Sequence, residues 1–224
     1  MGHGKYIDPV IAGPVIAGPV IAGPVIAGPV IAGPVIAGLT GNLIRLEAGE
    51  SKTLEFVILP GESRDIDVTV DLAGEGAELT IKALYLSGAS EKVSIRTLVH
   101  HRAKGCKSRQ IINGIAGGRS SFHFDGVIVV APGADGTEAY QENHNIVLTE
   151  EAKVETKPQL EIYADDVKCS HGATTGRLGE DELFYMRSRG IPEKEARTLQ
   201  MLSFLSPVIP EGRREEIEAA VRSL

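Results

Sequence analysis

A two-residue alternation of apolar and polar side chains recurs along the middle of the chain and limits its fold more than any other feature. "AELTIKALYL" and "EKVSIRTLVH" show this alternation, and "FDGVIVVA", "HNIVLT" and "PQLEIYA" add shorter apolar runs. In "SRDIDVTVDL" the apolar set is Ile66, Val68, Val70 and Leu72. A period of two places successive side chains on opposite faces of a strand. The pattern predicts a series of strands of about ten residues at short spacing, and no helix before residue 176.

The segments between these strands bear on two all-β architectures, a sandwich and a parallel β-helix. Corners of small residues, such as "LEAGES", "LAGEGAEL" and "LSGASEKV", stand ahead of the next strand. The hairpin dipeptide Asn-Gly occurs once, at Asn113-Gly114, which is fewer than an antiparallel meander would use. The spacing therefore favours the parallel β-helix, and the sandwich is the alternative.

After residue 176 the apolar period becomes helical, which predicts a helical region over residues 177–224. "EDELFYMRSRG" begins with carboxylates and ends with arginines before Gly190, as suits the helix dipole and a glycine just past the last turn. "IPEKEARTLQMLSFLSP" places Pro192 at the expected first helical position. The same segment predicts a buried stripe of three leucines, Leu199, Leu202 and Leu205. "GRREEIEAAVRSL" predicts a last helix with the apolar residues Ile217, Ala220, Val221 and Leu224.

The beginning of the chain has a different texture. After a leader, residues 1–8, residues 9–38 are six identical copies of the pentad PVIAG, and the predicted β-helix core runs over residues 39–176. Proline at every fifth position costs a helix about 3 kcal/mol each time, which excludes a membrane-spanning helix. Gly-Pro corners followed by Val-Ile-Ala favour an extended, β-helix-like backbone, although this unit offers no polar outer face. The alternative is that residues 9–38 are not native sequence.

Composition excludes several classes of function. The formal net charge is −7 without a long basic run, which predicts no nucleic-acid partner. Neither a secretory signal nor a membrane span is expected, and two cysteines suit a reducing, cytoplasmic setting. Aromatic residues make up 4% of the chain and tryptophan is absent, which disfavours a β-helix enzyme acting on polysaccharide. No nucleotide-binding or hydrolase motif is present, so the sequence predicts no enzyme.

Two short segments carry side chains that could bind a metal. "HHRAKGCKSRQ" places Cys106 shortly after His100 and His101, and "DDVKCSHGATTG" places Cys169 two residues before His171. Residues i and i+2 share a face of a strand, so Cys169 and His171 could approach one iron or zinc ion. The alternative is that each cysteine is a small buried apolar residue and each histidine a satisfied polar one.

The segment "KPQLEIYADDVKCSHGATTGRLGEDELFYMRSRGIPEKEAR" resembles the C-terminal part of the SufB/SufD family of iron–sulfur cluster assembly proteins, in its SufD branch. "AYQENHNIVL" and "HHRAKGCKSRQ" also have counterparts in that family. The resemblance implies a right-handed parallel β-helix followed by a helical tail. It implies a scaffold that pairs with a SufB-like subunit or a second copy of itself, and that docks a SufC-like ABC ATPase through its C-terminal helices.

The resemblance also assigns expected roles to individual residues. His171 matches a SufD histidine at the interface that handles the nascent cluster, and Cys169 lies in the same motif. The tail residues expected to contact the ATPase, or else to form the tail core, are Phe184, Tyr185, Met201, Leu202 and Phe204. The SufB branch has a cysteine near the position of Met186, so its absence implies that this chain does not hold a cluster alone. We therefore expect no tightly bound cofactor and a cluster present only transiently in the complex.

The resemblance has one departure, since family members are commonly about twice this length and have further coils where the pentads stand. A self-assembling structural β-solenoid, led by the pentads, is the alternative function from another class. A β-helix enzyme acting on polysaccharide is less favoured.

Overall fold

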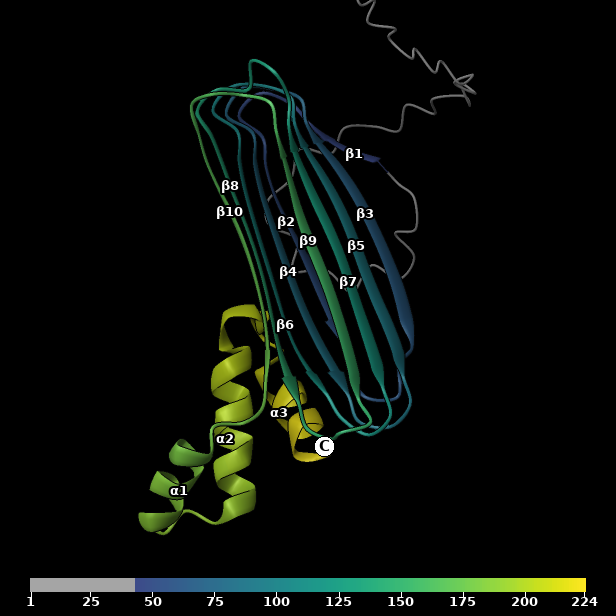
Figure 1. The fold of residues 1–224 in the computed structure, drawn as a ribbon, viewed down its shortest axis with the longest axis vertical. Helices are drawn as coiled ribbons and strands as arrows, with labels where there is room; N and C mark the ends of the chain where they lie inside the picture. Colours follow the sequence, from purple (N-terminus) through teal and green to yellow (C-terminus); the bar gives the residue numbers. More distant parts are fainter. Residues whose placement is uncertain (1–42) are drawn as a thin grey trace, which may run out of the picture. The chain divides into compact units, whose positions relative to one another are not determined.

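The computed structural model describes residues 43–224, which form ten β-strands followed by three α-helices and a short 3-10 helix (Figure 1). The leader and the PVIAG repeat lie outside the described residues, as do residues 39–42 of the expected β-helix core. The strands are β1 (Leu43–Leu46), β2 (Ser51–Ile58), β3 (Arg64–Leu72), β4 (Glu78–Ser87), β5 (Lys92–His101), β6 (Lys107–Ala116), β7 (Ser121–Val130), β8 (Thr137–Val147), β9 (Lys153–Ile162) and β10 (Val167–Gly176).

The strands form two five-stranded parallel sheets. The odd-numbered strands make one sheet in the order β1-β3-β5-β7-β9, and the even-numbered strands make the other in the order β10-β8-β6-β4-β2. We call them the odd sheet and the even sheet. Each odd strand and the even strand after it form one coil, so five coils stack on one another (Figure 1). The predicted parallel β-helix is confirmed, and the sandwich is wrong.

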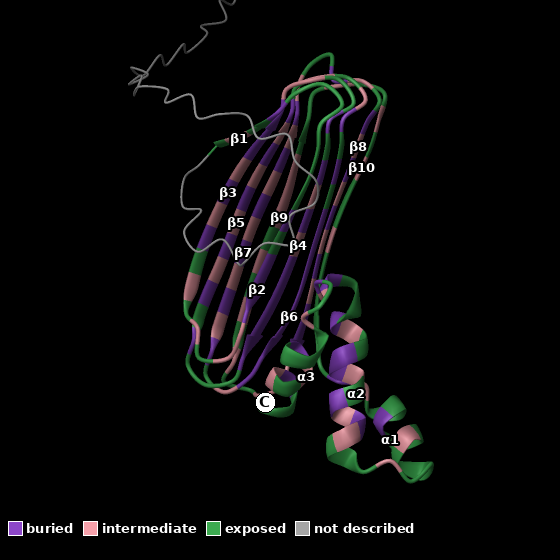
Figure 2. Cartoon of the chain, turned by 180° about the vertical axis from the view of Figure 1, so that it is seen from behind, coloured by how far each residue is buried: buried purple, intermediate pink, exposed green. Residues whose placement is uncertain are grey.

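The core lies between the two sheets and follows the alternation read from the sequence. Ile66, Val68, Val70 and Leu72 of β3 all face inward, each at most 6% exposed. The facing strands contribute apolar residues such as Ile81 of β4, so the two inner faces enclose one apolar cluster. Figure 2 shows this as alternating buried and partly exposed residues along the strands of the odd sheet. Burial of this apolar surface is the main force that holds the coils together.

One corner of the coil is built from stacked glycines. Gly76 and Gly105 occupy the turn between the odd and the even strand of successive coils, with φ of 68° and 65°. These left-handed conformations strain any residue with a Cβ atom. Gly76 donates its N–H to Lys104 O at 3.0 Å, and Gly105 donates to Asp135 O at 2.9 Å, so each corner is bonded to the next. This repetition explains the small-residue corners in the sequence.

The C-terminal helices cover part of the outer face of the even sheet. They are α1 (Glu180–Ser188), α2 (Glu193–Leu205) and α3 (Arg214–Arg222), and the 3-10 helix η1 (Ser206–Val208) follows α2. Leu84 and Ile115, which point outward from β4 and β6, are buried in a second apolar cluster with residues of α2 and α3. The Asn113 side chain also donates a hydrogen bond to Phe204 O at 2.8 Å. The helical region therefore packs on the β-helix through apolar contacts and this bond.

The helices differ from the sequence expectations at two residues and agree with them at a third. Pro192 caps α2 with extended backbone and does not occupy its first helical position. Residues spaced by three shift steadily around the helix axis, so Leu199 does not share the buried side of α2 with Leu202 and Leu205 and is 41% exposed. The buried stripe instead includes Thr198, Met201, Leu202 and Leu205. Gly190 follows α1 with φ of 86° and donates its N–H to Arg187 O, which confirms the predicted glycine at this helix end. Among the described residues, none of the helices has the length and apolar character needed to cross a bilayer.

Candidate functional site at the open end of the β-helix

The last coil, β9 and β10, forms one end of the β-helix, and no further coil of residues 43–224 stacks on it. Each of these ten-residue strands lies at the edge of its sheet, and no strand among residues 43–224 pairs with its outer edge. Inner-face residues that would be buried in an internal coil are therefore exposed here, as Figure 2 shows along β10. Long unpaired edge strands readily accept a strand from another chain. This end of the β-helix is therefore well suited to bind a partner chain through strand pairing.

The structure places both residues of the Cys169–His171 pair on this uncovered face. Cys169 pairs in register with Ala139, and His171 pairs with Gln141. Since Ala139 and Gln141 face the interior of the preceding coil, Cys169 and His171 face the same way. Cys169 is half-buried and His171 is exposed. The pair therefore lies where the interior of the β-helix meets its surroundings.

Cys169 and His171 together supply two potential ligands for a metal ion. Burial raises the pKa of the Cys169 thiol, so it is protonated at neutral pH and must lose its proton to bind iron. Within residues 43–224 no group of three or more histidine, cysteine, aspartate or glutamate side chains is arranged to hold a metal ion. A metal or a cluster at His171 would thus need ligands from outside the described residues.

The first cysteine segment does not form a comparable site. His101 is buried at the end of β5, where its Nε2 lies 2.8 Å from Ser108 Oγ, whereas His100 points outward toward Asp71. Burial lowers the pKa of His101 to about 4, so this imidazole is neutral at pH 7. The Cys106 thiol donates to Gly74 O at 3.2 Å, and burial raises its pKa. These residues are structural parts of a corner.

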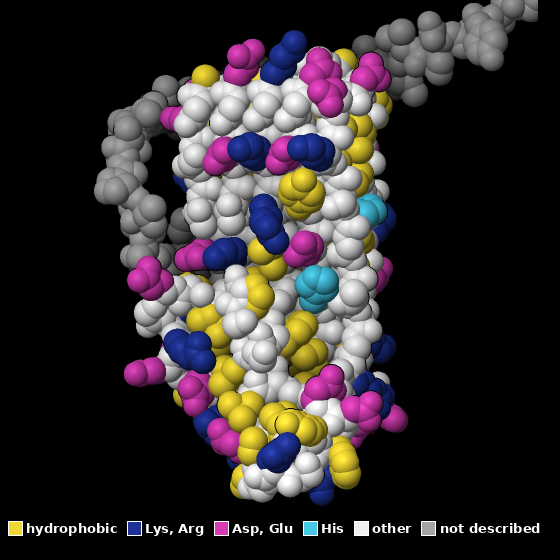
Figure 3. Space-filling model, turned by 90° about the vertical axis from the view of Figure 1, so that its left-hand side faces the viewer, with side chains coloured by type: hydrophobic (Ala, Val, Ile, Leu, Met, Phe, Trp, Pro, Cys, Tyr) yellow, Lys and Arg dark blue, Asp and Glu magenta, His cyan; other side chains and the backbone are white. Residues whose placement is uncertain are grey.

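The outer face of the even sheet carries a ladder of alternating charge. Glu78, Lys107, Glu138 and Lys168 are register partners on successive strands. Figure 3 shows acidic and basic side chains alternating in a row across this face. Lys107 Nζ lies 3.2 Å from Glu78 Oε1, and Lys168 Nζ lies 3.1 Å from Glu138 Oε1. Each of these charges therefore has a residue of opposite charge beside it on the next strand, and the row ends with the positive charge of Lys168 on the edge strand β10.

The five expected tail residues separate into a surface group and a core group. Phe184 and Tyr185 on α1 are 73% and 58% exposed, and the Arg189 guanidinium lies 5.3 Å from the centre of the Tyr185 ring. Met201 and Leu202 on α2 are buried in the cluster between the helices and the even sheet, and Phe204 is half-buried beside them. Phe184 and Tyr185 are therefore the two residues of this set that are largely exposed.

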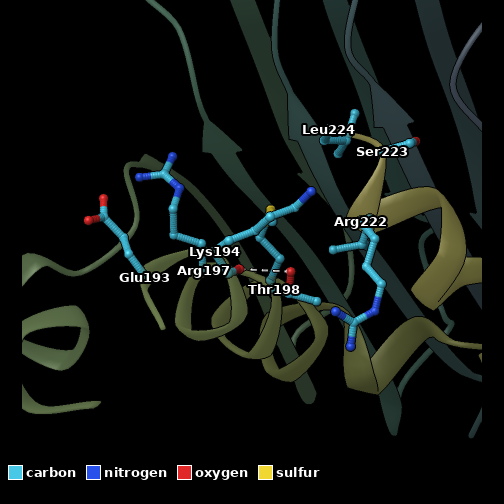
Figure 4. Close-up of a pocket in the computed structure, with 9 residues that line it drawn as sticks. Glu193, Lys194, Arg197, Thr198, Arg222, Ser223 and Leu224 are labelled. Atoms are coloured by element: carbon cyan, nitrogen blue, oxygen red, sulfur yellow. Dashed lines mark hydrogen bonds between the residues drawn. The ribbon is translucent and has the colours of Figure 1, made fainter. Parts of the chain in front are cut away.

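A groove of about 460 Å³ lies between α2 and the end of α3 (Figure 4). Lys194 and Arg197 line it with the end of the chain, Ser223 and Leu224. The guanidinium of Arg222 at its margin is already paired with Glu195 and Glu218, which raises its pKa. The groove contains no histidine or cysteine, and its residues belong to the helical region alone.

The sequence interpretation missed a buried polar set in the middle of the even sheet. Gln110, Gln141 and Asn143 face inward and are fully buried. "AYQENHN" contains the signal, because its period of two places Gln141, Asn143 and Asn145 on the face of Ala139. These inward amides stand out from the other strands, which present mainly apolar residues to the interior.

Known proteins similar to this chain share one description. The family described as "SUF system FeS cluster assembly, SufBD core domain" matches residues 45–204. The iron–sulfur cluster assembly protein SufD of Escherichia coli is 38% identical over 155 residues, which are 69% of this chain and 37% of that protein. SufD of Bacillus subtilis is 32% identical over 143 residues, which are 64% of this chain and 33% of that protein. A SufBD family protein of Synechocystis is 46% identical over 99 residues, or 44% of this chain and 22% of that protein.

The family match covers most of the β-helix together with α1 and nearly all of α2, because it runs from β1 into α2, and it does not include α3. The aligned part of this chain spans less than two fifths of the length of each of these three relatives.

Proposed function

The chain belongs to the SufBD core family of the SUF system for iron–sulfur cluster assembly, and we propose that it acts there as a non-catalytic, SufD-like scaffold. In this role the β-helix contributes ligands and a pairing surface, and the helical region docks an ATPase. The cluster is the cargo of the assembly and is not a resident cofactor of this chain.

The observation that carries the proposal is the uncovered last coil. It presents His171 and Cys169 on a face bordered by two unpaired edge strands, β9 and β10. A partner that docks on these edges therefore brings its own side chains directly to His171. Two ligands from this chain and further ligands from the partner would complete an iron site that neither subunit holds alone.

The edge strands define the chemistry of that partner. Backbone N–H and C=O groups along β9 and β10 can be satisfied by strands of another chain, which is the β-augmentation mode of binding. A SufB-like subunit with its own β-helix, or a second copy of this chain, would continue both sheets across the joint. Pro158 removes one donor from β9, so pairing along that strand is interrupted at this position.

We place the ATPase on the exposed side of α1. Phe184 and Tyr185 provide apolar surface there, and aromatic residues in an exposed group are typical of binding hot spots. Since α1 contacts α2, and α2 packs on the even sheet, a movement of the ATPase would be transmitted to the β-helix. The buried Met201 and Leu202 would support this surface without touching the ATPase.

Co-purification tests the proposal. A tagged form of the full chain should retain a SufC-like ABC ATPase, and separately a SufB-like subunit or a second copy of itself. Phe184→Ala with Tyr185→Ala should release the ATPase only, and a Pro substitution at the exposed Ala173, whose N–H faces the open edge of β10, should release the β-helix partner only. Failure to retain either protein, with the tail intact, would exclude the scaffold role.

A further inference from the structure

One column on the inner face of the even sheet changes from apolar to polar as it approaches the open end. Ile81, Gln110, Gln141 and His171 are successive register partners on β4, β6, β8 and β10. Ile81, Gln110 and Gln141 are all 0% exposed, whereas His171 is exposed. The polar part of the column therefore begins against an isoleucine and ends at His171.

The buried members of this column have polar atoms without partners. Among residues 43–224 neither the amide nitrogen nor the amide oxygen of Gln110 or Gln141 makes a hydrogen bond. Thr97 Oγ1 is likewise unpaired, and this residue is 2% exposed. We call Thr97, Gln110 and Gln141 the amide cluster.

The backbone of the odd sheet shows how the three residues come together. Thr97 pairs in register with Gly126 of the next coil. A Cβ atom at Gly126 would lie 2.5 Å from Gln141 Nε2, so the amide of Gln141 occupies the space that this glycine leaves open. Gln141 thus reaches across its own coil to Gly126, the register partner of Thr97, while its neighbour in its own column is Gln110 of the Thr97 coil.

The chemistry of the cluster identifies what it binds. Burying an amide without a partner is strongly unfavourable, and native proteins pair such groups with protein atoms or with ordered water. Two amides and a hydroxyl offer donors and acceptors in similar number and carry no charge, which suits water and does not suit a metal ion or an anion. A buried water makes two to four hydrogen bonds, and five unpaired atoms can supply them.

We propose that the amide cluster is a binding site for ordered water, and that Gln141 with this water positions the imidazole of His171. His171 is the next residue of the column, one strand spacing from Gln141. A hydrogen bond from the interior to one ring nitrogen fixes the tautomer and leaves the other nitrogen directed outward as a ligand. The hydrated site stands independently of the scaffold role, whereas its effect on an iron ligand rests on that proposed function.

The water site is tested on the full chain without any iron. Water-oxygen magnetic relaxation counts long-lived internal waters, and a high-resolution crystal structure locates them. Gln110→Met and Gln141→Met, which keep the side-chain shape, should each remove long-lived water. The matched control Gln159→Met, on the outer face of β9, should remove none. An unchanged water count in both cluster variants, with a raised melting temperature, would show a dry interior and overturn the proposal.

The positioning role is tested by nitrogen NMR of the histidine rings. Gln141→Met should change the tautomer ratio of His171 and leave that of His144, which faces outward on β8 and contacts Thr174, unchanged. Cluster formation in the reconstituted complex should fall about tenfold, as is typical when a partner of a metal ligand is lost. An unchanged His171 tautomer would overturn the positioning role. If His171→Ala leaves cluster formation intact while the waters are found, the scaffold mechanism is wrong and the hydrated site stands.

Discussion

Substituting Gly114 by alanine should destabilise the chain strongly, because this glycine makes room for a buried ring. A Cβ atom at Gly114 would lie 1.9 Å from Tyr85 Cε1 and 2.4 Å from Tyr85 Cζ. The ring cannot move aside, since it is stacked on Phe122 with centroids 3.8 Å apart. Its hydroxyl also donates to Asn145 Oδ1 at 2.8 Å. The ring therefore spans three coils and is fixed at both ends.

The magnitude follows from these contacts. Overpacking of a rigid site costs about 3 kcal/mol, and weakening the Tyr85 hydrogen bond costs about 1 kcal/mol more. Replacing a glycine within a strand recovers up to about 1 kcal/mol of backbone entropy. The net loss should be about 3 kcal/mol, which corresponds to a melting temperature lower by about 6–12 °C in a domain of this size.

Urea denaturation followed by circular dichroism measures this loss. Gly172→Ala is the matched control, because a Cβ atom there has no heavy atom within 4 Å, and it should change the free energy of unfolding by less than about 1 kcal/mol. In a Tyr85→Leu background the cost of Gly114→Ala should fall below about 1 kcal/mol. Equal costs in the two backgrounds would refute the coil register that also aligns Gln110, Gln141 and His171.

Three further predictions concern single residues. Burial alone would raise the pKa of Glu91, but hydrogen bonds from the backbone N–H groups of Gly61 and Ala89, each at 2.8 Å, lower it. Glu91→Gln should therefore lose about 1–2 kcal/mol of unfolding free energy at pH 7. The difference in urea midpoint between this variant and wild type should shrink as the pH falls through the lowered pKa of Glu91. Burial lowers the pKa of His101 to about 4, so stability should fall by about 2 kcal/mol between pH 7 and pH 5, and His101→Leu should remove this slope in pH-dependent denaturation. Phe184→Ala should leave the melting temperature unchanged and weaken ATPase binding in calorimetry by more than tenfold, while the exposed control Tyr163→Ala should not weaken it.

The alternation of residues predicted the strands well because burial between two sheets imposes a period of two. Every inward residue of β3 was assigned correctly, and the helical region begins within a few residues of the expected boundary. Leu84 follows the alternation onto the outer face of β4, but its burial beneath the helices depends on tertiary contacts that a local pattern does not encode. The expectation of a buried Leu199 is wrong for the same reason, since a helical period does not say which residues on either side of the stripe pack against the sheet.

The candidate site was predictable in part. A period of two places Cys169 and His171 on one face, and the structure confirms that they share it. The sequence does not say that this face belongs to the last coil, and exposure of His171 follows only from that position. The amide cluster was not predicted, because Thr97, Gln110 and Gln141 lie on three different strands and converge only through the coil register.

Under the proposed function, the last coil acts in cluster assembly through His171. The most direct measurement is the yield of iron–sulfur cluster in a complex reconstituted from this chain, a SufB-like subunit and a SufC-like ATPase. His171→Ala should lower the yield severalfold while folding and ATPase binding are retained, and Ser170→Ala, on the opposite face of β10, should have no effect. A wild-type yield from the His171→Ala complex would contradict the account.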